Sequence, residues 1–383
     1  MLELTEDQKA LAEMVRDFAT TRIAPNALDW DERQHFPVDV LAEAGQLGMG
    51  GIYAGEEFGG SALTRSDAIL VFEELAKACP TISAYISIHN MVVWMIDSFG
   101  TTEQRAHWLP EMTTMQNLGS YCLTEPGIGS DAAALTTRAR RDGDEYVLSG
   151  VKQFISGAGT SALYIVMART EGTGSRGISA FLVPGDSAGL SFGPNEKKMG
   201  WKAQPTRQVI MDGVRIPAGN LLGAEGQGFS MAMQALNGGR LNIAACSLGG
   251  GQHALEQSAA YLKERQAFGG PLTRQEALVF KLAEMDMGLE AARSLLRRAA
   301  AALDAKAPDR VRLCAMAKKV ATDAGFEAAN SAIQLHGGYG YLSDYGLEKI
   351  VRDLRVHQIL EGTNEIMRVI VARHLLNTEE ELR

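Results

Sequence analysis

The sequence predicts a mostly α-helical protein with a central antiparallel β domain. Only Pro271 and Pro308 follow residue 235, so the C-terminal part can be almost entirely helical, because proline interrupts an α-helix. Upstream of it, short runs rich in β-branched and aromatic residues are separated by Gly, Asp and Pro, which is typical of strands. These strands are clustered rather than alternating with helices, so we expect a β domain between two helical domains.

The two predicted helical domains are recognised by apolar residues at helical spacing. Residues 1–120 form the N-terminal helical domain, with Leu11, Val15 and Phe18 on one face of its first helix and a further helical run over 66–77. Residues 236–383 form a C-terminal four-helix-bundle domain, whose seam repeats at spacings of three and four. That seam consists of Leu278, Leu282, Met285, Leu289, Ala292 and Leu296.

The middle β domain is predicted over residues 121–235. Asp142-Gly143 lies where a tight hairpin turn would join two strands. The strand-like runs cover residues 145–148, 164–167, 178–183 and 209–211.

Composition excludes several classes of protein. The 37 basic and 46 acidic side chains give a net charge of -9, the wrong sign for a nucleic-acid binder. No apolar run approaches the roughly 18 residues of a membrane span. Four cysteines lie far apart with no Cys-x-x-Cys pair, which favours a reducing compartment. The N-terminus lacks signal-peptide features, so we expect a bacterial cytoplasmic protein, or a mitochondrial matrix protein from which a transit peptide has been removed.

A glycine-containing segment at residues 121–132 contains Gly127-x-Gly129-x-x-Ala132, which formally matches a dinucleotide-binding fingerprint. That fingerprint requires a long helix after the glycines, whereas here residues 136–141 run into the predicted hairpin. The alternative is a glycine turn between strands. The hydroxyls of Thr124 and Ser130, beside exposed backbone amides, would suit a polar heteroaromatic ring and an anionic ligand.

Other residue patterns carry weaker signals. His357 and Glu361 are four residues apart and could face a metal ion together, but no third ligand lies at useful spacing, so no metal site is predicted. The glycine pairs at 238–239 and 337–338 are compatible with close helix contacts or chain reversals. No Gly-x-Ser-x-Gly elbow occurs, which argues against the simplest serine hydrolase.

Glu361 is the sharpest candidate for a catalytic group. It precedes Gly362 and Thr363 at a break between helical runs, where its side chain can point into a cleft. If Ile359 and Leu360 exclude water from it, its pKa rises toward the range useful to a general base. The alternative is a surface glutamate at a helix terminus.

Taken together, these motifs resemble the acyl-CoA dehydrogenase family over essentially the whole chain. The matching segments are Tyr121-Cys-Leu-Thr-Glu-Pro-Gly-Ile-Gly-Ser-Asp, Lys152-Gln-Phe-Ile-Ser-Gly, Glu225-Gly-Gln-Gly-Phe, Arg265-Gln-Ala-Phe-Gly, Gln334-Leu-His-Gly-Gly-Tyr-Gly and Leu360-Glu-Gly-Thr-Asn-Glu-Ile. Within the family, the segments beginning at Ser156, Lys198, Leu236 and Val356 most resemble the isobutyryl-CoA subfamily.

The resemblance implies FAD as cofactor, a homotetramer and a set of binding residues. Glu361 would be the catalytic base. Along the flavin ring, the resemblance places Tyr121, Cys122, Leu123, Thr124, Gly129 and Ser130 on one side and Phe154, Ile155 and Ser156 on the other. Arg265 and Gln275 would hold the pyrophosphate and adenosine, and the nucleotide would also be reached from a neighbouring subunit by Gln334, Leu335, His336, Gly337 and Gly338. The remaining cofactor residues implied are Thr363, Asn364 and Glu365.

Substrate contacts are implied in the same way, by Ser130, Asn237, Gly238, Gly239, Arg240 and Arg373. Two departures from the common family pattern are Phe154, where many members carry Trp, and Leu360, where many carry Tyr. Both keep an apolar wall and so concern the shape of the acyl pocket. A minority of the family carries its base in the helix that begins near Leu236, but Gly239 occupies that region here.

The implied reaction is α,β-dehydrogenation of a short branched-chain acyl-CoA, isobutyryl-CoA to methacrylyl-CoA, with electrons passed to electron-transfer flavoprotein. A short-chain or 2-methylbutyryl-CoA dehydrogenase is the alternative within this chemistry. An acyl-CoA oxidase is a further alternative, although such oxidases usually carry another C-terminal domain. A catalytically silent FAD-binding scaffold is a fourth, and retention of Glu361 argues against it.

Overall fold

The computed structural model describes residues 4–376, so residues 1–3 and 377–383, at the outer ends of the first and third predicted domains, lie outside the described residues. Helices make up the N-terminal domain, and several begin with capping boxes, in which a threonine and the residue three positions on exchange hydrogen bonds with backbone amides. The main helices are α1 (Glu6–Phe18), α2 (Ala27–Arg33), α3 (Val38–Gln46), α4 (Arg65–Ala78), α5 (Pro80–Phe99) and α6 (Thr102–Thr113). The expected first helix and the helical run over 66–77 are confirmed as α1 and α4.

The middle domain is an eight-stranded sheet in the order β6-β7-β3-β2-β4-β5-β8, with β1 paired to β4. Its strands are β1 (Gly119–Cys122), β2 (Arg138–Asp142), β3 (Glu145–Ser156), β4 (Leu163–Arg169), β5 (Ile178–Pro184), β6 (Leu190–Phe192), β7 (Thr206–Pro217) and β8 (Leu221–Leu222). All four predicted strand runs lie in strands, and Gly143, with φ +63°, forms the predicted hairpin turn between β2 and β3.

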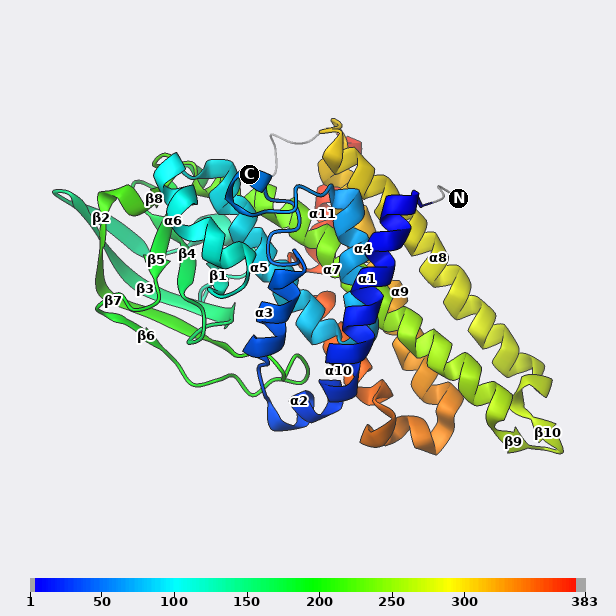
Figure 1. Ribbon diagram of the computed structural model, residues 1–383. Helices are drawn as coiled ribbons and strands as arrows, with labels where there is room; N and C mark the ends of the chain where they lie inside the picture. Colours follow the sequence, from blue (N-terminus) through cyan, green and yellow to red (C-terminus); the bar gives the residue numbers. More distant parts are fainter. Residues whose placement is uncertain (1–3, 377–383) are drawn as a thin grey trace.

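The sheet differs from the expected antiparallel one in two pairings. β1 runs parallel to β4, and Arg138 of β2 pairs in parallel with Arg169 of β4. The sequence did not predict the β1 pairing, because a strand of four residues is too short to show a sequence period. β1 thus brings the segment that begins at Tyr121 to the side of the sheet nearest the helices (Figure 1).

Up to residue 376, the last one described, the C-terminal domain contains three long helices and two shorter ones. They are α7 (Gly228–Glu264), α8 (Glu276–Asp304), α9 (Arg310–His336), α10 (Leu347–His357) and α11 (Asn364–Leu376), with a small hairpin of β9 (Gln266–Ala267) and β10 (Gly270–Pro271) between α7 and α8. α9 packs against α7, α8 and α11, which together form the bundle, and α10 lies across α7 and α9. The predicted boundary at 235/236 falls inside α7.

The helical domains share one continuous apolar core, and α7 runs through it. Residues from α1, α4 and α5 belong to the same buried cluster as residues from α7, α8 and α9, including the predicted seam residues Met285, Leu289, Ala292 and Leu296. In Figure 1 the sheet lies at one end of the molecule and the long helices at the other, with the N-terminal helices between. Among the described residues, no helix is long and apolar enough to cross a membrane.

Candidate active site

Glu361 lies in a tight turn between α10 and α11. Its φ is +55° and that of Gly362 is +84°, so two successive residues are left-handed. A non-glycine residue adopts this conformation at a cost of about 1 to 3 kcal/mol, and such strain is concentrated at functional sites. A side chain at position 362 would also lie 2.7 Å from the Met367 methyl group, which explains the glycine. The turn directs the Glu361 side chain toward α7.

The Glu361 carboxylate is packed against Gly239 of α7. A β carbon at Gly239 would lie only 2.6 Å from Oε2, so this position leaves room for the carboxylate and for no side chain of its own. Oε2 is buried and has no hydrogen-bond partner within the described residues. Burial raises the pKa of Glu361 to about 7, although the cations of Arg240 and Lys318 oppose the shift. A buried, unpaired carboxylate with this pKa is suited to accept a proton near neutral pH.

The apolar neighbours expected to exclude water do so only in part. Ile359 is half exposed, and Leu360 packs on the edge of the core. The turn after α10 rotates Ile359 outward, so the burial of the carboxylate comes from α7 and α9, which are distant in sequence.

Two buried cations hold the turn from behind. Arg240 Nε donates to the Glu361 carbonyl at 3.4 Å, and its Nη1 donates to Asn237 Oδ1 at 2.8 Å. On α9, Lys318 Nζ donates to the Gly362 carbonyl at 2.8 Å and to Asn364 Oδ1 at 3.0 Å. Burial lowers the pKa of Lys318 to about 8, while the Glu361 carboxylate opposes this. Lys318 was missed by the sequence analysis, because a single lysine within a helix is usually solvent exposed.

His357 is a buried structural residue. Trp201 Nε1 donates to its Nε2 at 3.2 Å, and its Nδ1 is 2.7 Å from Ser247 Oγ. Burial lowers the pKa of His357 to about 3, so the ring is neutral. Both ring nitrogens are occupied by protein partners, which leaves neither for a metal ion. Together with the bond from the Trp201 amide to Asp353 at 2.7 Å, these contacts fix the end of α10 that leads to Glu361.

Tyr121 brings a second unpartnered polar atom to this region. Its hydroxyl is buried without a hydrogen-bond partner among the described residues. Burial and the nearby Glu361 carboxylate raise the pKa of Tyr121 well above its usual value, so the hydroxyl remains protonated. Glu361 Oε2 and the Tyr121 hydroxyl are thus both buried without a hydrogen-bond partner in the described part of the chain, and the charge of the first raises the pKa of the second. Buried polar atoms without partners mark a place where an additional group can bind.

The loop after Tyr121 is held by a buried ion pair. Lys152 Nζ lies 2.9 Å from Glu125 Oε1 and donates to the Leu123 carbonyl at 3.0 Å. Burial disfavours the Glu125 carboxylate, but Lys152 and hydrogen bonds from Thr136 and Thr137 lower its pKa to about 2. The rest of the loop is open. A β carbon at Gly127 or Gly129 would meet no atom within 4 Å, and Ser130 is exposed, so backbone amides and a hydroxyl there are accessible to a ligand.

The predicted residues of β3 lie at a bulge. The register with β7 shifts between Lys152 and Ile155, and Phe154 has φ +60° and is 64% exposed. Bulges commonly redirect a side chain beside a functional site. Phe154 therefore presents an apolar ring to solvent, Ile155 enters the core, and the Ser156 carbonyl accepts a hydrogen bond from Ser120.

Comparison with known proteins agrees with this architecture. Models of the N-terminal, middle and C-terminal domains of acyl-CoA dehydrogenase match residues 5–116, 120–214 and 226–376. The chain belongs to the acyl-CoA dehydrogenase family. It is 52% identical to isobutyryl-CoA dehydrogenase, mitochondrial, of Dictyostelium discoideum and 50% identical to that of Bos taurus, in both cases over 97% of this chain and 90% of the relative. Butyryl-CoA dehydrogenase from Megasphaera elsdenii is 35% identical, with a TM-score of 0.95 over 98% of this chain and 100% of that structure.

In this acyl-CoA dehydrogenase, a second group of predicted cofactor residues lies far from Glu361. Arg265 ends α7, and its guanidinium is 5.6 Å from the ring of Tyr339. At about 1.5 Å per residue, the distance along α7 from Arg240 to Arg265 is roughly 40 Å. Gln334, Gly337 and Gly338 are exposed near this end of the enzyme.

Other predicted binding residues serve structural purposes within this protomer. Leu335 is buried, and so is His336, whose ring stacks on Tyr261 with its Nδ1 2.8 Å from the Ala332 carbonyl. Gln275 occupies the N-cap position of α8 without a side-chain capping hydrogen bond. Cys122 is buried in the core of the sheet, and Asn364 is buried beside Lys318. The Thr363 hydroxyl accepts a hydrogen bond from the Ile366 backbone N–H. Glu365 is exposed and forms an ion pair with Arg368, and Arg373 lies on α11.

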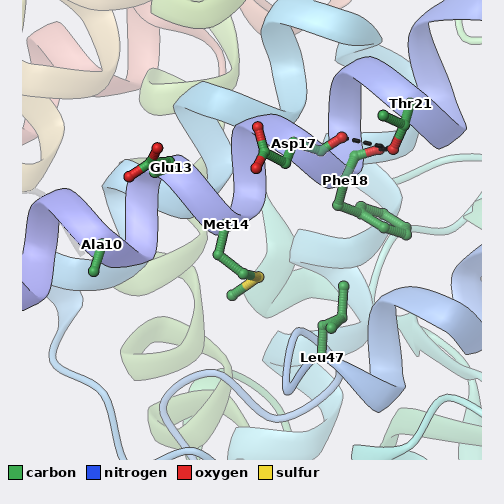
Figure 2. A pocket seen from close by; sticks show the side chains of 7 residues that line it. All are labelled: Ala10, Glu13, Met14, Asp17, Phe18, Thr21 and Leu47. Atoms are coloured by element: carbon green, nitrogen blue, oxygen red, sulfur yellow. Dashed lines mark hydrogen bonds between the residues drawn. The ribbon is translucent and has the colours of Figure 1, made fainter.

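A surface pocket of about 500 Å³ lies elsewhere on the enzyme, between α1 and the end of α3 (Figure 2). It is lined by Ala10, Glu13, Met14, Asp17, Phe18, Thr21 and Leu47. Thr21 Oγ1 donates to the Asp17 carbonyl at 2.7 Å, which is an ordinary helix contact. None of the residues predicted for catalysis or binding lines this pocket, so it is separate from the candidate active site.

Proposed function

We propose that this acyl-CoA dehydrogenase uses FAD to oxidise a short branched-chain acyl-CoA, with isobutyryl-CoA as the preferred substrate and methacrylyl-CoA as the product. The observation that carries the proposal is the Glu361 carboxylate, buried without a partner and with a pKa near 7. The α-hydrogen of a thioester is weakly acidic, so a positioned base in a water-poor site is what its removal requires.

The turn also supplies a donor for the thioester oxygen. No acceptor among the described residues takes the Glu361 backbone N–H, although the neighbouring Ile359 and Leu360 amides both bond to the Val356 carbonyl. We infer that this free N–H points at the oxygen on which negative charge develops. A fixed donor at that position contributes to transition-state stabilisation, because it needs no rearrangement as charge develops.

The residues around Tyr121 and Phe154 fit FAD. A flat ring system would cover the exposed Phe154 face and offer a partner to the buried Tyr121 hydroxyl, and the open backbone at Gly127 and Gly129 leaves room for close approach. When bound, FAD accepts the hydride from the β carbon. The protein's own part is to align the α C–H bond with Glu361 and to exclude water.

We further propose that each FAD is shared between subunits of a homotetramer. Arg265 lies roughly 40 Å along α7 from Arg240, and Tyr339, next to the exposed Gly337 and Gly338, lies beside Arg265. We infer that these residues do not contact a cofactor bound at Tyr121 and Phe154 of the same protomer. The same residues of a neighbouring subunit can reach it. A cofactor that bridges two subunits would couple its binding to assembly.

The names of the relatives from Dictyostelium discoideum and Bos taurus favour isobutyryl-CoA, whereas the Megasphaera elsdenii structure is that of a butyryl-CoA dehydrogenase. Because one methylene in an apolar pocket changes discrimination by only about 1 to 3 kcal/mol, overlap with 2-methylbutyryl-CoA and butyryl-CoA is expected.

Electron-transfer flavoprotein is the proposed electron acceptor. The two relatives are named as mitochondrial, and the four cysteines of this chain are buried and free, which suits the matrix or the bacterial cytoplasm.

The test is anaerobic titration of the purified protein with a panel of acyl-CoAs, followed by steady-state assays with electron-transfer flavoprotein or an artificial acceptor. We expect the highest kcat/KM with isobutyryl-CoA and poor activity with chains of eight or more carbons. An octanoyl-CoA optimum would contradict the substrate assignment. Rapid oxygen consumption with substrate would instead identify an oxidase, and a bound flavin that no acyl-CoA reduces would identify a silent scaffold.

A further inference from the structure

Four oxygen atoms from distant parts of the chain form a buried line behind the end of β3. Tyr85 Oη on α5 is 3.4 Å from Ser161 Oγ, which is 2.8 Å from Ser120 Oγ on β1. Ser120 Oγ is in turn 2.6 Å from the carbonyl oxygen of Ser156. Tyr85 and Ser120 are completely buried and Ser161 is nearly so, which excludes water as a competing partner.

Counting protons fixes the direction of these hydrogen bonds. The Ser156 carbonyl can only accept, so the single hydroxyl proton of Ser120 is donated to it. Ser161 must then donate to Ser120. Tyr85 donates to Ser161, because burial raises the pKa of Tyr85 far above neutral and keeps its proton in place. Ser161 and Ser120 each accept one hydrogen bond and donate the next, so successive bonds in the line reinforce one another.

The backbone that follows β3 is built around this line. Gly157 has φ +78°, and a β carbon there would lie 2.7 Å from Ser161 Oγ and 2.9 Å from Ser120 Oγ. The glycine therefore allows the hydroxyls to approach the chain immediately after Ser156. Phe154, two residues before Ser156, has the strained, left-handed backbone of the bulge. The hydroxyl line is thus anchored next to the segment that the proposed function assigns to the flavin.

We propose that Ser120 is a positioning residue for the flavin, acting through the Ser156 carbonyl to hold residues 154–156 in the shape that receives the ring. The inference rests on the proposed FAD function. A strained bulge relaxes unless neighbouring contacts hold it, and Ser120 supplies the one side-chain hydrogen bond to this carbonyl among the described residues. Tyr85 and Ser161 complete the line, linking the N-terminal helices to the proposed flavin-binding strand.

The test compares purified holoenzymes of wild type, Ser120→Ala and a matched control, Ser258→Ala. Ser258 is also completely buried and donates to a carbonyl, that of Ala254 at 2.7 Å, but it lies within α7 away from β3. We expect Ser120→Ala to release FAD about tenfold faster on dilution, followed by flavin fluorescence, because a buried carbonyl loses its donor. The visible absorption bands of the bound flavin should shift as well. Ser258→Ala should release FAD at the wild-type rate and keep the wild-type spectrum.

Wild-type FAD release and spectrum in Ser120→Ala, or equal effects in both variants, would overturn the positioning role. If Ser120→Ala does not fold, Tyr85→Phe decides the matter. It removes only the first donor and should accelerate FAD release about twofold, with a shift of the same sign, because a hydrogen bond of 3.4 Å is weak. No change in Tyr85→Phe would then overturn the proposal. A wild-type protein that binds no FAD would contradict the proposed function instead.

Discussion

A β carbon at Gly239 would lie 2.6 Å from Oε2 of Glu361, closer than non-bonded atoms approach. The two residues are far apart in sequence, yet the carboxylate of the proposed base is accommodated only because α7 has no side chain at this point. We therefore expect Gly239→Ala to displace the carboxylate and to reduce kcat by at least about tenfold, since small misplacements of a base are costly. Gly288→Ala is the control, because a β carbon there meets no atom within 4 Å. Wild-type kcat in Gly239→Ala would argue against tight packing at this contact.

Removing the proton acceptor should abolish turnover without unfolding the enzyme. Glu361→Gln preserves side-chain volume, and we expect at least about a hundredfold loss of activity with FAD and oligomeric state retained. Glu32→Gln, at an exposed glutamate of α2, should remain active. The measurement is the rate of flavin bleaching by isobutyryl-CoA. Bleaching of Glu361→Gln at a near wild-type rate would place the base elsewhere.

The rate should depend on pH through the base. A general base acts only when ionised, and the pKa of Glu361, the proposed base, is about 7, so kcat/KM should rise with pH and level off above neutrality. Lys318 and Arg240 favour the ionised form, so Lys318→Met should move the inflection to higher pH. Lys319→Met is the control, because its partly exposed ammonium pairs with Asp323 and, among the described residues, makes no hydrogen bond or ion pair with the turn at Glu361. An unshifted profile in Lys318→Met would contradict this role of Lys318.

The same carboxylate should reduce the stability of the folded enzyme at alkaline pH. A group whose folded pKa is raised stabilises the fold fully only below its unfolded pKa, and that contribution is lost as pH rises through about 7. The corresponding free energy is about 3 kcal/mol. Relative to wild type, Glu361→Gln should therefore be more stable at pH 8 than at pH 5, as judged by denaturant unfolding of the enzyme. A difference independent of pH would mean that the carboxylate is not desolvated.

Arg265 tests the proposed sharing of FAD between subunits. We expect Arg265→Ala to lose FAD and to lower the melting temperature of the tetramer together, because a bridging cofactor links the two equilibria. Arg33→Ala, which removes only an exposed helix pair with Asp29, should change neither. Size-exclusion chromatography and FAD content of the same samples provide the measurement. A cofactor-free Arg265→Ala tetramer with an unchanged melting temperature would contradict the coupling.

Local patterns in the sequence were sufficient to predict the fold class and to single out Glu361 as the candidate base. Each of the features used for the prediction can be recognised within a short stretch of sequence. They are the scarcity of proline after residue 235, the apolar seam of α8, the short β-branched runs and the turn at Glu361-Gly362. Lys318 could not be predicted, because its importance depends on α9 packing beside that turn. The parallel pairing of β1 and the line of hydrogen bonds from Tyr85 to Ser156 could not be predicted either. Both join segments that are distant in sequence and come into contact only in the folded chain.

The length of α7 has a genetic consequence. If one helix carries the substrate end of its own site and the cofactor end of its neighbour's, a defect at the substrate end of one subunit and a defect at the cofactor end of its partner fall in the same site. Coexpressed Glu361→Gln and Arg265→Ala subunits would then form pairs in which one site carries both substitutions and the other carries neither. Two impaired alleles would complement each other, restoring activity at about half of the sites in each mixed pair.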